Sequence, residues 1–446
     1  MSGSLDGDRQ MHYLEDVSIT DEPGGGVLNL NMARVDDPIK KLARGIIYQA
    51  LREGATSLNF QTTRDQVSMR YCVNGAFYEM APIPRDLSSP VTRELELMFG
   101  VANEVPQPLT RWQRFRKVVP NMEVISSGDF MDGDSVSRET VMQRSKEYKR
   151  VVLNFVRSTT DFGKQYNLKL FYHGKDNFID VLNEHQKQGL EELMESRSGL
   201  LLVVAGQGMG KTSICYDLLL QKGQERNIQG RVFAVGRTAV PPGDIQTIGM
   251  GIGNPKYPGA VRGIREFNPS LVVFDDIHDE FTAQEALSLA NNGTFVVASV
   301  CAHDLKAGLD YFRSFDIDSG LFAKSLRGLI GQTLVRNIHE GCKTEQVSND
   351  ELLGDFQGQK LYFGKGCPGC NCLGYVSRIP LVQFLDRRQI HKYSVDTLIK
   401  SSQAQTSLAI SLGKPFHELA KPLVLDGKVD EREYYRLKLE DSVRNI

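Results

Sequence analysis

The sequence predicts an α/β protein in which a parallel sheet follows a smaller α+β domain. Over residues 183–446, continuous apolar strands alternate with helical segments, a pattern typical of a parallel sheet covered on both faces. Over residues 35–180, short strands and two helices indicate a separate domain. The length of 446 residues agrees with two or three domains, since a domain takes about 150 residues.

The composition excludes several classes of protein. Hydrophobic residues make up 41% and charged residues 24%, as in ordinary globular proteins. A net charge of −2 gives no global basic field for nucleic acid. We expect no transmembrane helix because no apolar run reaches about 18 residues, and no secretory signal because the N-terminus is acidic and polar. Seven cysteines, four of them late in the chain, indicate a reducing compartment and a metal site rather than a disulfide framework.

The N-terminal part begins with a polar, Gly-rich stretch over 1–34, which we expect to be a disordered tail. A helix should follow. Asp37 is suited to its N-cap, Pro38 to its first turn, and Gly54 to its end.

Strands dominate the rest of this domain. Asn74 and Gly75 form a dipeptide that is typical of a hairpin turn between two strands. The stretch 120–150 is polar and charged, and it forms either a long loop or a set of edge strands. The other expected elements are strands at 57–61, 66–73, 76–80, 151–156 and 168–173 and a helix at about 88–101.

The second domain carries a phosphate-loop pattern. An apolar strand at 200–205 runs into GQGMGKTS and then into an apolar helix, which is the order of a P-loop. The glycines let backbone N–H groups turn inward around an anion, and the helix N-terminus adds positive charge. A chance Gly-rich turn is the alternative, and the flanking strand and helix argue against it. The predicted nucleotide-binding residues are Gly206, Gln207, Gly208, Met209, Gly210, Lys211, Thr212 and Ser213.

Lys211 is placed to reach the β- and γ-phosphates of ATP, and Thr212 to ligate Mg²⁺. A P-loop also needs an acidic partner, which the segment NPSLVVFDDIHDE supplies at the end of an apolar strand. Asp275 and Asp276 would there meet Mg²⁺ and the attacking water, with Asp276 orienting the water. The alternative is that the two aspartates cap the next helix.

At this point the chain resembles the secretion ATPase superfamily, in particular the type II secretion and type IV pilus assembly ATPases. The resemblance covers about residues 36–400. It rests on DDPIKKLARGIIYQALREGATSLNFQ, QVSMRYCVNG, LLLVVAGQGMGKTS, NPSLVVFDDIHDEFTAQEALSLANNGTFVVASVCAHD, SLRGLIGQTLVRNIHEGCK and CPGCNCLGYVSRIPLVQFL. It implies a hexameric ring motor whose subunits join a PAS-like N-terminal domain to a RecA-like ATPase domain, with ATP between them.

The resemblance also implies that arginines close on the phosphates. Arg70 matches one arginine of the smaller domain, and the usual companion two residues later is Cys72. Arg262 matches an arginine of the ATPase domain, while the next expected arginine falls at Glu266. Taken alone, Arg70 is equally well an ordinary surface arginine on a strand.

Several positions depart from the pattern of this family. The catalytic glutamate corresponds to Asp276, and the glycine before it to Asp275. A shorter carboxylate changes the reach by about 1.5 Å, one carbon–carbon bond, and such a misplacement can cost about 100-fold in rate. The arginine that usually follows is His278, the histidine-box histidine is Cys301 with His303 nearby, and GRTAVPPGD lacks the expected acid. Nucleotide binding is therefore better supported than fast hydrolysis.

A second pattern predicts a structural zinc site. Cys367 and Cys370 form a C-x2-C pair, and the resemblance places His339 and Cys342 at the family's first zinc-binding pair. Histidine and thiolate are both good tetrahedral Zn²⁺ ligands, so the four would close a site in a subdomain at about 336–385, with Cys372 as a spare. The alternatives are a surface histidine with free thiols and, less favoured, a redox pair.

Together these features predict a cytoplasmic, hexameric motor ATPase that uses ATP, Mg²⁺ and structural Zn²⁺ to drive pseudopilus or pilus assembly. Its expected partners are an inner-membrane platform protein and cytoplasmic adaptors, with membrane contact only through them and no nucleic acid. The alternatives are a nucleotide-binding regulatory subunit that hydrolyses poorly and, more weakly, a DNA-directed motor. The charged C-terminal segment 430–441 is expected to be a solvated helix.

Overall fold

The computed structural model divides into two compact units, residues 1–175 and 176–446. Two stretches discussed above lie largely outside the described residues: the predicted tail, at 1–25 and 28–34, and most of 120–150. The structure describes residues 26–27, 37–63, 66–99, 113–120, 150–160, 163–173, 178–223, 231–236, 246–248, 257–347, 354–370, 372–392 and 414–442. Among these residues, no helix is both long and apolar enough to cross a bilayer.

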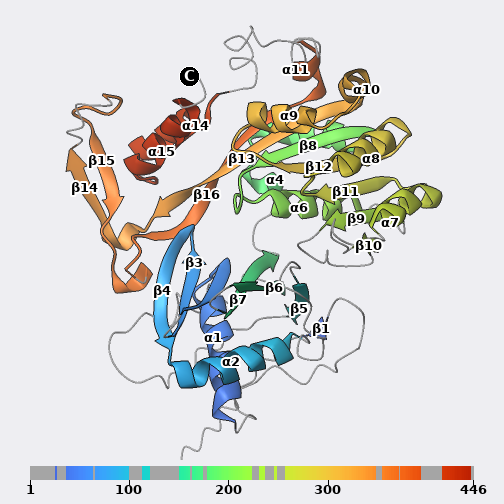
Figure 1. Cartoon of the computed structure of the whole chain (residues 1–446). Coiled ribbons are helices and arrows are strands. Elements are labelled where there is room, and N and C mark those ends of the chain that lie inside the picture. The colour runs from blue at the N-terminus through green and yellow to red at the C-terminus, as the bar shows by residue number, and fades with distance from the viewer. Residues whose placement is uncertain are drawn as a thin grey trace, which may run out of the picture. The chain divides into compact units, whose positions relative to one another are not determined.

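The first unit is a seven-stranded sheet with two helices, α1 (Pro38–Arg52) and α2 (Arg85–Met98), which pack against each other (Figure 1). The strand order is β1-β5-β6-β7-β2-β3-β4. The strands are β1 (Gly26–Val27), β2 (Ser57–Thr62), β3 (Val67–Val73), β4 (Ala76–Ile83), β5 (Gln113–Pro120), β6 (Arg150–Thr160) and β7 (Gly163–His173). The stretch 1–34, which was predicted to be a disordered tail, contains strand β1, and β1 pairs with β5.

Local signals set the limits of these elements. Asp37 accepts a hydrogen bond from the Ile39 N–H at 2.8 Å, and Gly54 takes a left-handed φ of 67° just after α1, as predicted. The hairpin turn between β3 and β4 is confirmed, with Asn74 at φ 51° and Gly75 at φ 83°. Helix α2 begins three residues before the predicted limit, because Pro84 caps its start.

The second unit is built on a mostly parallel sheet of order β10-β9-β11-β12-β8-β13-β16, in which only β13 and β16 pair antiparallel. The strands are β8 (Gly199–Ala205), β9 (Val232–Gly236), β10 (Gln246–Ile248), β11 (Leu271–Asp275), β12 (Phe295–Cys301), β13 (Leu326–Ile338) and β16 (Tyr375–Leu385). The parallel sheet predicted from continuous apolar runs is thus confirmed.

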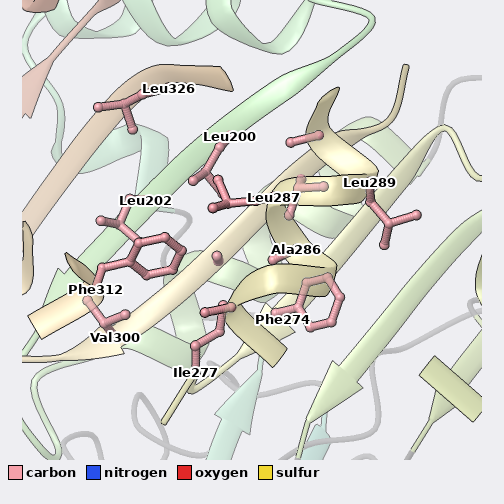
Figure 2. Packing of buried hydrophobic residues seen from close by; sticks show 14 of the residues in the cluster. Leu200, Leu202, Phe274, Ile277, Ala286, Leu287, Leu289, Val300, Phe312 and Leu326 are labelled. Carbon is pink, nitrogen blue, oxygen red and sulfur yellow. The ribbon is translucent and has the colours of Figure 1, made fainter. Parts of the chain in front are cut away.

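Helices cover both faces of this sheet because alternate residues of each strand point to opposite sides. Leu200 and Leu202 pack with the helices after β11 and β12, as Figure 2 shows, while Leu201 and Val203 pack with α5 and α6. The helices are α4 (Phe178–Val181), α5 (Glu184–Met194), α6 (Lys211–Gly223), α7 (Tyr257–Gly263), α8 (Glu280–Asn291), α9 (Leu305–Ser314), α10 (Ser319–Ser325) and α11 (Arg387–Lys392).

A third core lies at one end of this unit (Figure 1). It joins β13, β15 (Lys360–Gly364) and β16 to α14 (Phe416–Leu425) and α15 (Glu431–Ser442). Strand β14 (Lys343–Val347) pairs with β15. The predicted charged C-terminal helix is present as α15, but beside its solvated face it buries Glu433, Tyr434 and Leu437. Glu433 Oε1 accepts a hydrogen bond of 2.6 Å from Arg336 Nε on β13. The charge pattern of the helix does not indicate this partner.

Candidate functional site

The phosphate loop joins the buried strand β8 to helix α6. Gly208 and Gly210 have left-handed φ values of 74° and 90°, which glycine adopts without a steric penalty. Gly210 also leaves no room for a side chain, because a Cβ there would meet the amide nitrogen of Gln332. The other predicted nucleotide-binding residues lie in the same loop or the first turn of α6: Gly206, Gln207, Met209, Lys211, Thr212 and Ser213.

Two side chains from outside the loop hold its carbonyl groups. Gln332 Nε2 on β13 donates to the Met209 carbonyl at 2.8 Å, and Arg378 Nη1 on β16 donates to the Gly208 carbonyl at 2.9 Å. These two bonds fix the peptide groups of Gly208 and Met209, and they thereby hold the shape of the loop. Sequence analysis missed both residues, although Gln332 is a polar residue inside an apolar strand.

Thr212 and Asp275 form the first of two contacts between the loop and the end of β11. Thr212 Oγ1 donates to the Asp275 carboxylate, with distances of 3.1 and 3.2 Å to its two oxygens. Asp275 is 5% exposed. Its backbone pairs with Gly236 on β9, which has no side chain where Asp275 Cβ packs. A hydroxyl beside a carboxylate in this position is the donor set that binds Mg²⁺ in P-loop proteins.

Lys211 and Asp276 form the second contact. Lys211 Nζ lies 3.3 Å from Asp276 Oδ1. Asp276 has a φ of 74°, which non-glycine residues rarely adopt and which clusters at functional sites. Its N–H donates to Ser299 Oγ at 2.8 Å, and its carbonyl lies 2.8 Å from His278 Nδ1. The two predicted aspartates therefore meet the two predicted loop residues directly.

The field around this carboxylate pair is negative. Burial, followed by the charge of Asp276, raises the pKa of Tyr311 on α9. Burial, followed by the charge of Asp275, raises the pKa of Cys215 on α6 well above its ordinary value. Both shifts reflect the negative charge of the two aspartates, and the positive charge of Lys211 opposes each of them.

The remaining predicted positions are less directly connected to the loop. Arg262 on α7 lies 3.8 Å from Glu285 Oε1 and over the Phe281 ring, and its side chain is 66% exposed. In the first unit, Arg70 on β3 makes an ion pair of 2.7 Å with Glu79 across the hairpin. Cys301 ends β12 opposite Ala205, the last residue before the loop, and its side chain is exposed.

The four predicted zinc ligands come together in the second unit. The ligand atoms of His339, Cys342, Cys367 and Cys370 all lie within 4.8 Å of one another. Cys342 Sγ is 3.8 Å and Cys367 Sγ 3.9 Å from Cys370 Sγ, and Cys367 Sγ is 3.4 Å from His339 Nδ1. A tetrahedral ion with Zn–S bonds of about 2.3 Å would have S···S edges of about 3.8 Å and S···N edges of about 3.6 Å. The residues therefore fit zinc.

Backbone hydrogen bonds support this cluster. Burial raises the pKa of the Cys370 thiol, but the hydrogen bonds donated by the N–H groups of Cys367 and Gly374 lower it, and the net pKa is lowered. A lowered pKa favours the thiolate that a metal requires. The four ligands lie at two short turns. His339 directly precedes η2 (Glu340–Cys342), which ends in Cys342, and Cys367 directly precedes η3 (Pro368–Cys370), which ends in Cys370. Cys372, the predicted spare, is exposed and outside the cluster.

The sheet, the phosphate loop and the two aspartates at the end of β11 define the class of the P-loop proteins. More specifically, residues 177–436 match the model of the Type II/IV secretion system protein family, and the chain belongs to that family.

Known proteins extend this result. The chain is similar to the Type II secretion system ATPase E of Vibrio cholerae, with 26% identity over 78% of this chain and 65% of the relative, so it spans about two thirds of that protein. The Type IV pilus assembly ATPase TfpB of Acinetobacter baylyi is 20% identical over 92% of this chain and 67% of its own length. The ATPase DotB of Legionella pneumophila has a similar fold, with a TM-score of 0.56 and 12% identity, covering 92% of this chain and 98% of that one.

Proposed function

We propose that this chain binds ATP with Mg²⁺ and hydrolyses it as a motor subunit of a secretion or pilus-assembly machine. One arrangement carries the proposal: two consecutive residues at the end of β11 contact two consecutive residues at the start of α6. Asp275 meets Thr212, and Asp276 meets Lys211. An amide-lined loop, a lysine, a hydroxyl and a carboxylate pair are together suited to phosphoryl transfer to water.

Each residue then has a distinct task. The loop N–H groups and Lys211 bind the phosphates and stabilise the charge that develops on the γ-phosphoryl group. Thr212 and Asp275 are the residues that would hold Mg²⁺, and that ion when bound neutralises phosphate charge. Asp276 accepts a hydrogen bond from the attacking water and orients it. Arg70 and Arg262 add positive charge as ATP is enclosed.

His339, Cys342, Cys367 and Cys370 would hold Zn²⁺ as a closed structural site. Because all four positions are protein ligands, none is left for a substrate. The site follows β13 and precedes β16, the strands whose Gln332 and Arg378 bind the phosphate loop. Zinc would thus stabilise the subdomain at about 336–385.

The proposed assembly is a cytoplasmic homo-hexamer whose subunits each have a PAS-like first unit and a RecA-like second unit. It works beside an inner-membrane platform protein and cytoplasmic adaptors, which supply its membrane contact, and it does not act on nucleic acid. Family membership and the names of the two relatives, a secretion ATPase and a pilus assembly ATPase, support this role.

Steady-state phosphate release tests the motor. Wild type should turn over ATP in the presence of Mg²⁺, and Lys211→Ala should abolish turnover. Lys187→Ala is the control, since Lys187 lies on α5 and makes an ion pair of 3.1 Å with its helical neighbour Glu184. Turnover that survives in Lys211→Ala would rule out the assigned site.

A second candidate is a regulatory subunit that binds ATP and hydrolyses it poorly. The observation that favours it is the side chain of Asp276, which is one methylene shorter than a glutamate and lies against Lys211. ATP binding by wild type, lost in Lys211→Ala, without measurable turnover would select this function over the motor.

A further inference from the structure

Ser299 on β12 contacts three consecutive residues at the nucleotide site. Its hydroxyl accepts a hydrogen bond from the Asp276 N–H at 2.8 Å and lies 3.4 Å from Asp275 Oδ1, to which it donates. Its backbone carbonyl accepts from the Ile277 N–H at 2.8 Å. The residue is 0% exposed.

The two N–H groups that Ser299 binds lie on either side of the Asp276 Cα. They therefore fix both backbone dihedrals of the residue with the left-handed φ of 74°. An L-residue in this region is disfavoured by steric contact of its Cβ, and such a conformation persists only where neighbouring groups determine it. The parallel ladder of β11 and β12 ends one residue earlier, at Phe274 and Ala298. Beyond the end of this ladder, Ser299 accepts the hydrogen bonds of both the Asp276 and the Ile277 N–H groups.

We infer that Ser299 is a positioning residue for the carboxylate pair. Its hydroxyl turns Asp275 toward Thr212, and its two acceptor atoms hold the backbone turn that directs Asp276 to Lys211. The inference rests on the proposed function, since it concerns the same site. Because Ser299 is 0% exposed, it acts through the two aspartates.

Removing the hydroxyl separates this role from ordinary packing. Ser299→Ala leaves the Asp276 N–H without its acceptor, and the left-handed turn loses one of its two restraints. A carboxylate misplaced by about 1 Å can lower the rate by about 100-fold. The loop and Lys211 keep their own contacts, so KM for ATP should change little. Ser299→Thr restores the hydroxyl.

The experiment compares the kinetics of three variants. In Ser299→Ala we expect kcat to fall by about 100-fold with KM for ATP within about 3-fold, and in Ser299→Thr a recovery of at least 10-fold. Ser325→Ala is the matched control: Ser325 is also buried, at 2% exposed, but its hydroxyl donates to Leu321 within α10. Should Ser299→Ala not fold, Ser299→Cys keeps the volume with a weak acceptor and should show the same loss.

Either a kcat within about 3-fold of wild type in folded Ser299→Ala, or an equal loss in Ser325→Ala, would overturn the inference. If wild type binds nucleotide without turnover, the proposed hydrolysis fails. The role of Ser299 is then tested by its effect on Asp275, the residue that would hold Mg²⁺. The readout is then the gain in affinity for a fluorescent ADP analogue on adding Mg²⁺. Ser299→Ala should reduce this gain by about 2- to 3-fold and Ser299→Thr should keep it, whereas an unchanged gain overturns the inference.

Discussion

Lys211 Nζ lies 3.3 Å from Asp276 Oδ1, so the lysine of the phosphate loop already contacts an anion. The lysine side chain is 11% exposed, whereas the aspartate side chain is 37% exposed and open to water. An incoming phosphate must therefore compete with Asp276 for the same ammonium group. In the proposed function, the carboxylate that orients water also opposes nucleotide binding.

This relationship predicts opposite effects of Asp276→Asn on binding and turnover. Asparagine tolerates the left-handed backbone and keeps the side-chain size, but it cannot pair with Lys211 as an ion. A partly exposed ion pair contributes about 0.5–1 kcal/mol, so ADP should bind roughly 2- to 5-fold more tightly. Turnover should fall by about 100-fold because the acceptor of the water loses its negative charge and half of its oxygens.

Titration of a fluorescent ADP analogue and a phosphate-release assay would measure both effects. Asp310→Asn is the control, since Asp310 is an exposed residue of α9 that pairs with Arg313. Weaker ADP binding by Asp276→Asn would contradict the competition.

The stability of the second unit should fall as pH rises through about 6. Burial, followed by the charge of Asp180, raises the pKa of Asp217 on α6 to about 6, against the N–H donated by Phe178. Because the folded-state pKa lies above the unfolded value of about 3.9, the folded state binds the extra proton. This contribution is complete below about pH 4 and is lost between pH 4 and pH 7.

Asp217→Asn should remove that dependence while keeping an oxygen for the Phe178 N–H, which lies 2.9 Å from Asp217 Oδ2. At pH 7.5 the variant should be more stable than wild type by up to about 3 kcal/mol, from a shift of about two pKa units. Urea unfolding at pH 4.5, 6.0 and 7.5 measures the difference. Parallel pH profiles for the two proteins would refute it.

The sequence was sufficient for the parts of the site that are local in the chain. The phosphate loop is predicted by the apolar run before residue 206, the glycines and the lysine. Its geometry follows from a strand, a loop and a helix that succeed one another directly in the chain. Likewise, Asp275 and Asp276 end an apolar strand, and parallel strands bring such ends to one edge of a sheet. The C-x2-C spacing also carries its own geometry.

The parts that the sequence did not predict depend on contacts between distant residues. Gln332 is separated from the Met209 carbonyl by 123 residues, and Arg378 from that of Gly208 by 170. Neither spacing has a local signature. Ser299 looked like a small residue of an apolar strand, because its task depends on the backbone turn at Asp276.

Loss of zinc should unfold the C-terminal part of the second unit at lower temperature. Metal that binds only the folded state stabilises it by about 4 kcal/mol when free zinc is 1,000-fold above Kd, which corresponds to roughly 10 °C in Tm. Cys370→Ser should lose about one equivalent of zinc by elemental analysis and lower Tm accordingly.

Cys372→Ser is the matched control for the zinc prediction, because Cys372 lies two residues away, is exposed and is outside the ligand cluster. It should keep both zinc and Tm. Equal zinc content in Cys370→Ser and wild type would show that the cluster is not a metal site.

The last prediction concerns the buried charge on α15. Glu433 is 4% exposed, accepts from Arg336 Nε at 2.6 Å and from Arg436 Nη2 at 3.0 Å, and Arg336 also lies over the Tyr375 ring. Removing one member of a buried pair leaves the other charge without compensation. Glu433→Ala should therefore lower the free energy of unfolding by about 3 kcal/mol or more.

The control for this change is Glu440→Ala on the same helix. Glu440 makes an ion pair of 2.9 Å with Arg436 one turn away, but its side chain is 43% exposed, so its loss should cost less than about 1 kcal/mol. Denaturant unfolding of both variants measures the contrast. Equal losses would mean that α15 is held by its apolar face alone, through Tyr434 and Leu437, and that Arg336 finds water when Glu433 is absent.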